Sequence, residues 1–297
     1  MTAAPSSFAT LPHNLVLAAV RRALDEDLGL SGDITTDATV APSARSVALL
    51  AARKPGIVSG LALAETAFRE LDPACDFTIQ IADGCPVFAG DTIARISGKS
   101  RAILSAERVA LNFMGRMCGI ATLTRRYVDA VQGTGAQIVD TRKTTPGLRA
   151  FEKYAVRCGG GHNHRFGLFD AVLIKDNHIV AAGGIEAAIR AAKATAGHMT
   201  KIEVEVDTLE QLEIVVREGA DCVLLDNMGP TDLRKAVGIV AGRCLTEASG
   251  GVNLDTVREI AETGVNMISV GALTHSAPVL DLGLDFIPPG NTSGAGA

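Results

Sequence analysis

The sequence predicts an α/β barrel, complete or nearly so, that follows a small α+β domain. Short, almost continuously apolar runs alternate with amphipathic stretches over the second half of the chain, which is typical of parallel strands covered by helices. This alternation recurs about six or seven times, and a barrel commonly results from such a repeat. A doubly wound open sheet is the structural alternative. The 297 residues, 47% of them apolar, can bury a sizeable core.

The first domain is expected to cover residues 1–112. A helix is predicted from Leu15 to Leu28, because Asn14 is a suitable N-cap and Gly29 follows the last turn. Alternating apolar residues and turn signals predict the remaining elements, which are strands at 47–51, 77–81 and 93–96 and a helix at 61–71.

The barrel domain is expected to cover residues 113–275, with the tail 276–297 packing back on the first domain. A long helical stretch from about Arg101 to Val131 leads into it, with Gly115 or Gly119 as the place for an interruption. The predicted barrel strands are 137–139, 171–174, 202–206, 222–225, 244–246 and 267–270. The predicted helices between them are 184–196, 208–218, 230–241 and 253–262.

The composition excludes several classes of protein. The formal net charge of −5 argues against a general nucleic-acid binder, which usually carries a basic surface. None of the six cysteines forms a C-x-x-C pair, so they are expected to be reduced thiols. The N-terminus lacks a secretory signal pattern, and no apolar run approaches the roughly 20 residues that span a bilayer. We therefore expect a cytoplasmic protein with no membrane partner.

Charged side chains follow most of the predicted barrel strands directly. The carboxyl ends of parallel barrel strands converge on one rim, where barrel enzymes place their active sites. Ordinary polar turn residues would explain one or two of these ends, but they poorly explain bulky charges at most of them. The strand ends concerned are Asp140 to Lys143, Lys175 to His178, Glu205 with Asp207, Asp226 with Asn227, and Glu247 to Gly251.

The segment from Asp140 to His178 is basic within an acidic chain. It holds seven Lys and Arg and four Asp and Glu, and seven minus four gives +3. A solvated face of the helix at 148–158 is expected to account for Arg149 and Lys153. It does not account for Arg142, Lys143 and Lys175, which follow directly from apolar strands. Because arginine binds carboxylate or phosphate bidentately, the ligand should be strongly anionic.

The later strand ends indicate a phosphate ligand and a metal. Carboxylates such as Glu205 and Asp226 usually act beside phosphates through a divalent cation, commonly Mg²⁺, although an acid could also stabilise a cationic sugar directly. Two later strands end in Ser249-Gly250-Gly251 and Gly271-Ala272, where glycine lets backbone N–H groups approach a phosphate. His162 and His164 could chelate a metal, but no third ligand is evident, so an anion-binding loop is favoured there.

Several motifs together resemble the quinolinate phosphoribosyltransferases, also called carboxylating nicotinate-nucleotide pyrophosphorylases. The resemblance covers nearly the whole chain, and the order and approximate spacing of the motifs are kept. It implies an N-terminal open-faced sandwich and an incomplete, seven-stranded α/β barrel. The motifs are 140–149, 153–157, 159–165, 174–178, 203–206, 225–227, 247–251 and 270–275.

The resemblance also implies an activity and residue roles. The enzyme would transfer the phosphoribosyl group of 5-phosphoribosyl 1-pyrophosphate to quinolinate with decarboxylation, giving nicotinate mononucleotide for NAD synthesis. It would form homodimers, or multiples of dimers, in which Arg108 enters the neighbouring subunit's site. Arg142, His164 and Arg165, with Thr141 beside them, would hold the quinolinate carboxylates. The catalytic residues Lys143, Lys175, Glu205 and Asp226 would surround the ribose, the pyrophosphate and Mg²⁺, and Ser249, Gly250, Gly251, Val270, Gly271 and Ala272 would bind the 5-phosphate.

Three other functions remain open at this point. A related phosphoribosyltransferase could act on another base such as nicotinate, although one carboxylate would need fewer arginines. A barrel isomerase or aldolase could hold a phosphorylated sugar, with Lys143 or Lys175 forming a Schiff base. A binding module without catalysis is the third, and the number of charged residues at one rim argues against it.

Overall fold

The computed structural model describes residues 10–288, and these form two compact units. The first unit contains residues up to Leu123 together with 150–160 and the chain from Ala277 onward. The second contains 124–149 and 161–276. The chain therefore passes between the units several times, and the expected boundary at residue 112 lies inside a helix, α4 (Ser100–Ala130).

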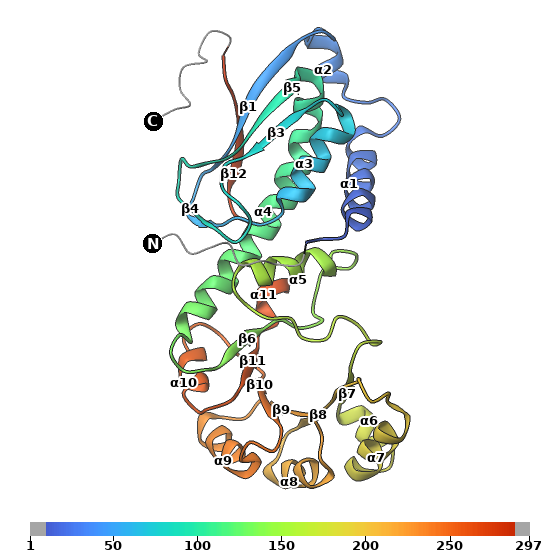
Figure 1. Cartoon of the computed structure of the whole chain (residues 1–297), viewed down its shortest axis with the longest axis vertical. Helices are drawn as coiled ribbons and strands as arrows, with labels where there is room; N and C mark the ends of the chain where they lie inside the picture. Colours follow the sequence, from blue (N-terminus) through green and yellow to red (C-terminus); the bar gives the residue numbers. More distant parts are fainter. Residues whose placement is uncertain (1–9, 289–297) are drawn as a thin grey trace. The chain divides into compact units, whose positions relative to one another are not determined.

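A four-stranded antiparallel sheet forms the centre of the first unit, in the order β12-β1-β5-β3. The last described strand along the chain, β12, pairs with β1 and so brings Leu282–Phe286 onto this sheet (Figure 1). The ring of Phe68 on α3 lies 6.0 Å from that of Phe77 on β3, which joins a helix to the sheet. The bounds are α1 (His13–Leu28), β1 (Arg45–Ala52), α3 (Leu61–Leu71), β3 (Asp76–Ile79), β5 (Thr92–Lys99) and β12 (Leu282–Phe286).

Three short elements of the first unit were not predicted. The helix α2 (Ile34–Thr39) begins where the Asp33 side chain accepts a hydrogen bond from the backbone N–H of Thr36, at 2.9 Å. The strands β2 (Gly56–Ile57) and β4 (Pro86–Val87) pair only with each other. Elements of two residues carry too little periodicity to be recognised in a sequence.

The long helix α4 is uninterrupted, so the expectation of a break near Gly115 or Gly119 was wrong. Its glycines instead let another part of the same unit approach. A Cβ atom added to Gly119 would lie 2.0 Å from the backbone oxygen of Pro278, and one added to Gly115 would lie 2.8 Å from a side-chain carbon of Val279. The segment before β12 thus lies directly against the helix backbone, which only glycine permits.

We expect Gly119→Ala to destabilise the protein by about 1–3 kcal/mol, because the carbonyl of Pro278 belongs to the backbone and cannot swing aside. Gly238→Ala is the matched control, since a Cβ atom at that helical position meets nothing within 4 Å. Gly238→Ala should stabilise by up to about 1 kcal/mol. Thermal unfolding followed by circular dichroism measures both changes, and a Gly119→Ala midpoint at or above that of the unmodified protein would contradict the packing argument.

A parallel sheet with the strand order β6-β11-β10-β9-β8-β7 forms the centre of the second unit. In Figure 1 the strands follow an arc, with helices α7 to α10 along its outer side. The strands are β6 (Gln137–Val139), β7 (Val172–Ile174), β8 (Ile202–Val206), β9 (Cys222–Asp226), β10 (Leu245–Ser249) and β11 (Met267–Ser269). The helices are α6 (Asp176–Ala181), α7 (Ile185–Thr195), α8 (Leu209–Glu218), α9 (Pro230–Val240), α10 (Val257–Ala261) and α11 (Ala272–His275).

The arc does not close, which agrees with the expected incomplete barrel. Within residues 10–288 its sheet has six strands, and the outer edge of β6 carries only one further bridge, from Val139 to His162. The residues that cross the open side, His162 to Arg165, are called the bridging segment below. Because side chains alternate along a strand, Glu203 and Glu205 of β8 share one face, and the strand register aligns Cys222 of β9 with Glu203.

Three helical predictions differ from the structure. The helix α10 begins at Val257 rather than 253, because the Asn253 side chain accepts from the backbone of Asp255 and Thr256 in a turn. The short helices α6 and α11 were not predicted. The helix α5 (Arg149–Cys158) buries Lys153, whose exposed fraction is 2%. The prediction that Lys153 lies on a solvated face of this helix was therefore wrong. Its neighbour Glu152 is also buried and pairs with Arg116 at 2.8 Å.

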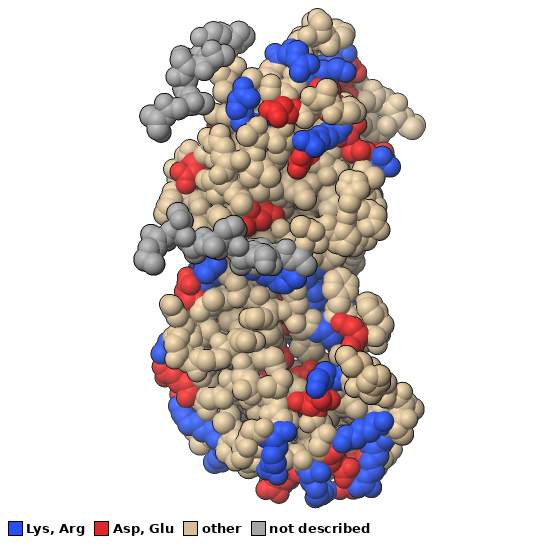
Figure 2. Space-filling view, in the orientation of Figure 1, with Lys and Arg blue, Asp and Glu red and all other residues tan. Residues whose placement is uncertain are grey.

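The outer surface of the second unit shows ordinary charge distribution. Figure 2 shows basic and acidic side chains interspersed over its helices, and pairs such as Arg190–Glu218 join neighbouring helices there. Exposed pairs of this kind contribute little to the free energy of unfolding.

All six cysteines are free thiols. Among the described residues, no helix is both long and apolar enough to cross a bilayer.

Candidate active site

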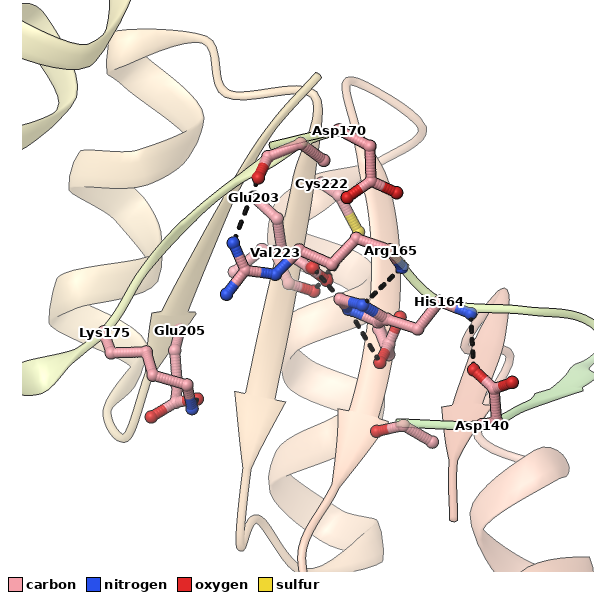
Figure 3. A network of polar contacts seen from close by, with 12 residues as sticks. Asp140, His164, Arg165, Asp170, Lys175, Glu203, Glu205, Cys222 and Val223 are labelled. Atoms are coloured by element: carbon pink, nitrogen blue, oxygen red, sulfur yellow. Dashed lines mark hydrogen bonds and ion pairs between the residues drawn. The ribbon is translucent and has the colours of Figure 1, made fainter. Parts of the chain in front are cut away.

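The carboxyl ends of β7, β8 and β9 bring three predicted site residues to one rim. Lys175 follows β7 and its Nζ forms an ion pair with Oε2 of Glu205 on β8 (Figure 3). Asp226 ends β9, and its Oδ2 accepts a hydrogen bond of 2.6 Å from Asn227 Nδ2. The second oxygen of each carboxylate has no hydrogen-bond partner among the described residues. The rim therefore presents carboxylate oxygens beside an ammonium group.

The two loops after β6 and β11 meet at Lys143. The Thr274 hydroxyl donates to the backbone oxygen of Lys143 at 2.7 Å, and the Lys143 backbone N–H donates to Thr141 Oγ1 at 3.1 Å. A Cβ atom at Gly271 would lie 3.1 Å from Lys143 Cδ, so the lysine chain passes over this glycine. Lys143 is exposed, and its position depends on both loops.

The glycine turn after β10 depends on the absence of side chains. Gly250 and Gly251 have φ values of +94° and +60°, which L-residues rarely adopt. A Cβ atom at Gly250 would lie 2.1 Å from Asn227 Oδ1 and 2.9 Å from the backbone nitrogen of Asn227. The Asn227 N–H also donates to the Ser249 oxygen at 2.9 Å. The turn is thus held against the end of β9, with backbone available to a ligand.

The bridging segment is anchored to β6 by a buried carboxylate. Asp140 has no exposed surface, and its Oδ1 accepts from the backbone N–H of His164 at 2.9 Å. Its Oδ2 accepts from Asn163 Nδ2 at 2.7 Å. On the other side of the opening, the Arg165 guanidinium donates to the Ala171 oxygen at 3.0 Å, just before β7. Side-chain bonds therefore replace the strand pairing that is missing here.

Arg142 and Arg165, called the arginine pair below, have unsatisfied donors. The Nε atom of each is buried and has no hydrogen-bond partner among the described residues. Burial lowers the pKa of Arg165, and the nearby positive charge of Arg142 lowers it further. Two partly buried cations that repel each other and keep free donors are arranged to receive an anion.

His164 points into the barrel rather than toward a free space at the rim. Its Nδ1 accepts from the backbone N–H of Arg165 at 2.7 Å, so this nitrogen carries no proton. The proton must then be on Nε2, which donates to Oε2 of Glu203 at 2.8 Å. The ring is therefore the neutral Nε2–H tautomer, with both nitrogens engaged (Figure 3).

The same tautomer argues against a metal at this cluster. His164, Glu203 and Glu247 offer three ligand atoms within 4.8 Å of one another, which is close enough for a metal ion. A metal would need the lone pair of Nε2, but Nδ1 already uses its own lone pair as an acceptor, so the ring would have to lose its last proton. We read His164 and Glu203 as a hydrogen-bonded pair, with Glu247 beside it.

A cavity of about 320 Å³ lies beside these residues, and Arg165, His164 and Glu203 line it together with residues at the amino ends of the strands. Residues at strand beginnings, including Val172, Leu245 and Met267, line it, while Glu203 and Glu247 lie deeper. Glu247 is 2% exposed, and its Oε1 has no hydrogen-bond partner among the described residues. Its separation from His164 Nε2 is 3.8 Å, too long for a hydrogen bond.

Burial raises the pKa of Glu247 to about 7, and the charges of Glu203 and Asp140 raise it further, whereas the hydroxyl of Ser269 lowers it. The folded protein then holds a proton that the unfolded chain releases at lower pH, so stability falls as pH rises from about 4.5 to 7.

We expect Glu247→Gln to remove this loss, because glutamine resembles the protonated acid. The variant should be more stable than the unmodified protein at pH 8, by up to about 3 kcal/mol, and similar to it near pH 4.5. Glu213→Gln makes the same change on the exposed face of α8 and is the control. Urea unfolding at several pH values measures the difference, and identical pH profiles for both variants would refute the assignment.

The structure brings most of the predicted site residues together in the second unit, whereas Arg108 belongs to the first unit. Arg108 is exposed on α4 in the first unit and makes no ion pair or hydrogen bond among the described residues. Sequence reasoning did not predict the contacts that join His164, Glu203 and Cys222, and it placed Glu247 after a strand, whereas Glu247 lies inside β10. The available signals were glutamates within short strands, Glu203 in β8 and Glu247 in β10.

Comparisons with known proteins show the family of this chain. Residues 33–118 match the family model described as "Quinolinate phosphoribosyl transferase, N-terminal domain", and residues 120–285 match the C-terminal domain model of the same family. The chain is 44% identical over 260 residues to the probable nicotinate-nucleotide pyrophosphorylase [carboxylating] of Bacillus subtilis, covering 88% of this chain and 89% of that protein. It is 45% identical over 272 residues to the Mycobacterium leprae protein of that name, covering 90% and 95%. The solved nicotinate-nucleotide pyrophosphorylase from Francisella tularensis superposes with a TM-score of 0.89 at 40% identity, covering 94% and 98%.

Proposed function

This chain belongs to the quinolinate phosphoribosyl transferase family, and from that premise we propose how its residues carry out the reaction. The protein is a carboxylating nicotinate-nucleotide pyrophosphorylase: it joins the phosphoribosyl group of 5-phosphoribosyl 1-pyrophosphate to quinolinate and releases pyrophosphate and carbon dioxide. The product is nicotinate mononucleotide, an intermediate of NAD synthesis. The cytoplasmic location stays a prediction.

The arginine pair carries the assignment of quinolinate. Quinolinate has two adjacent carboxylates on a pyridine ring, and Arg142 and Arg165 offer two guanidinium groups whose buried Nε donors have no partner in the part of the chain that the structure describes. A bound dianion would neutralise both charges and satisfy both donors. Nicotinate, with one carboxylate, would leave one of the two cations uncompensated.

The reaction places charge where the rim can stabilise it. The pyridine nitrogen forms a bond to the anomeric carbon of the ribose as the bond from that carbon to pyrophosphate breaks. The sugar becomes cationic in this step, and the carboxylates of Glu205 and Asp226 lie at the rim to stabilise it. Lys143 and Lys175 supply positive charge for the pyrophosphate oxygens. The ring nitrogen of the adduct is cationic, so it withdraws the electron pair of the breaking bond between C2 and the carboxylate, and C2 then takes up a proton.

The 5-phosphate fits the glycine-lined strand ends. Ser249, Gly250 and Gly251 follow β10, and Val270, Gly271 and Ala272 follow β11. The positive φ angles of the first turn expose backbone N–H groups that a phosphate can approach closely. Barrel enzymes commonly bind phosphate at this pair of loops.

The rim residues fit Mg²⁺. Glu205 and Asp226 lie on adjacent strands, and each keeps one oxygen without a partner among the described residues. Mg²⁺ prefers oxygen ligands and usually takes one or two carboxylates together with substrate phosphates. When bound, the ion would neutralise charge on the departing pyrophosphate.

A product assay tests the function directly. The purified protein is incubated with quinolinate, 5-phosphoribosyl 1-pyrophosphate and Mg²⁺, and nicotinate mononucleotide and carbon dioxide are measured. Both should form in equal amounts, and nicotinate in place of quinolinate should react poorly. Faster turnover of nicotinate, or trapping of a sugar phosphate on Lys143 or Lys175 by borohydride, would support the other activities instead.

We further propose a homodimer in which Arg108 completes the site of the neighbouring subunit. Arg108 is exposed and has no acidic partner among the described residues, so a structural ion pair does not explain it. A third cation would suit a dianionic substrate that binds beside a second, highly charged one.

Subunit mixing tests the shared site. Arg108→Ala and Lys175→Ala should each lower activity by at least about tenfold. A hybrid dimer of the two would contain one site with both residues intact, so random mixing should restore up to about a quarter of the activity of the unmodified enzyme. Mixing Arg108→Ala with itself is the control. If exchange is demonstrated by mass spectrometry and activity stays low, Arg108 does not act across subunits.

A further inference from the structure

Side-chain hydrogen bonds hold the bridging segment in place. Residues 162–165 cross the open side of the barrel, and among the described residues their strand pairing is limited to one bridge, between His162 and Val139. Arg165, which belongs to the arginine pair, lies at the end of this segment. Its guanidinium can meet a carboxylate correctly only if its backbone is fixed, because bidentate contacts depend strongly on geometry.

One side of the segment is held by Asp140, which directly follows β6, and the other side is held through the His164 ring. The backbone N–H of Arg165 donates to Nδ1 of this ring at 2.7 Å. The opposite nitrogen, Nε2, donates to Glu203 on β8 at 2.8 Å. The imidazole thus connects the backbone of Arg165 to a carboxylate in the barrel interior (Figure 3).

Glu203 is itself fixed on its far side. Its second oxygen, Oε1, accepts from the thiol of Cys222 on β9 at 3.3 Å, and the residue is 9% exposed. Each oxygen therefore has its own donor, and the carboxylate has no free rotation about its last bond. The alternative acceptor for His164 Nε2 is Oε1 of Glu247, 3.8 Å away, so loss of Glu203 would let the ring swing toward it.

We propose that Glu203 is a positioning residue for quinolinate: by holding the Nε2–H tautomer of His164, it sets the backbone of Arg165 and thus the geometry of the quinolinate carboxylate site. This inference rests on the proposed role of Arg165. It assigns Glu203 no contact with substrate and no part in the chemical step. Movement of a substrate-orienting group by about 1 Å can cost about 100-fold, so the expected effect is large.

The experiment compares Glu203→Leu with Glu203→Gln. Leucine removes the acceptor for His164, and quinolinate should bind at least about tenfold more weakly by calorimetry, while the KM for 5-phosphoribosyl 1-pyrophosphate changes less than about twofold. Glutamine keeps a carbonyl oxygen for Nε2–H, and quinolinate affinity should stay within about threefold. Cys222→Ala is the matched control, because it removes the other partner of Glu203 without touching His164.

Nitrogen NMR of His164 gives a readout that is independent of substrate. In the unmodified protein and in Glu203→Gln, Nε2 should carry the proton and Nδ1 should not, whereas Glu203→Leu should lose this single tautomer. The opposite tautomer in the unmodified protein would overturn the proposal even if the leucine variant does not fold. Unchanged quinolinate affinity in a folded Glu203→Leu, or equal weakening of both substrates, would also overturn it. Absence of any quinolinate-dependent product would instead refute the proposed function, and the NMR result would still test the hold of Glu203 on His164.

Discussion

Arg165→Ala should raise the KM for quinolinate by about 30-fold to 5,000-fold, while the KM for 5-phosphoribosyl 1-pyrophosphate changes little. Removing one partner of a desolvated charge pair costs about 2–5 kcal/mol, because the other charge is left unpaired. Arg165 meets this condition, since within residues 10–288 its buried Nε has no partner and burial lowers its pKa. Arg142 alone would then face two carboxylates.

Steady-state kinetics with each substrate varied in turn measures this selectivity. The KM for quinolinate in Arg165→Lys should lie between those of the unmodified enzyme and Arg165→Ala, because lysine keeps the charge but loses the planar, bidentate donor geometry. Arg190→Ala is the control: it removes an exposed arginine paired with Glu218 on the outer helices, where about 0–1 kcal/mol is expected. Equal increases in both KM values for Arg165→Ala would mean that the residue supports the site as a whole and does not recognise quinolinate.

Hydrophobic periodicity predicted the elements that have enough length to show it. The helix at Leu61–Leu71 begins and ends as expected, and each predicted barrel strand overlaps an observed one. The glycines of α4 misled the prediction, because a glycine in a helix can mark either a break or a close approach. Only the position of Pro278, far away in the sequence, decides between the two.

Strand ends predicted much of the rim, because parallel strands bring their carboxyl ends together whatever the details of packing. Lys175 and Glu205 form the ion pair that this geometry allows. The network behind the rim could not be predicted in the same way. The contact between His164 and Glu203 joins residues 39 positions apart and depends on how the bridging segment crosses the open barrel.

The position of His164 also changes the interpretation of its role. The resemblance placed it among the groups that hold the quinolinate carboxylates. Its ring nitrogens are both engaged, with Arg165 on one side and Glu203 on the other. A ring in this state orients the neighbouring arginine without offering a free donor of its own. Direct binding of a carboxylate by His164 stays a prediction, and it would require the bond to Glu203 to break.

Removal of divalent cations should abolish product formation, and Mg²⁺ should restore it. The reason is electrostatic: the pyrophosphate group carries several negative charges as it departs, and Lys143 and Lys175 alone would compensate only part of them. Lys175 is in addition already paired with Glu205. Activity is measured in excess chelator and then during titration with Mg²⁺ at fixed substrate concentrations.

Variants of Glu205 and Asp226 test whether these two rim carboxylates bind the Mg²⁺. Glu205→Gln and Asp226→Asn should each raise the Mg²⁺ concentration needed for half-maximal activity by about tenfold or more, because a neutral amide is a much weaker ligand for a hard cation than a carboxylate. Asp232→Asn makes the same chemical change at an exposed position of α9, where the carboxylate pairs with Lys235, and should leave the requirement unaltered. Full activity in excess chelator would eliminate the metal from the mechanism. If the Mg²⁺ concentration needed for half-maximal activity is unchanged in both rim variants, and their activity is low at every Mg²⁺ concentration, these carboxylates instead act on the cationic ribose directly.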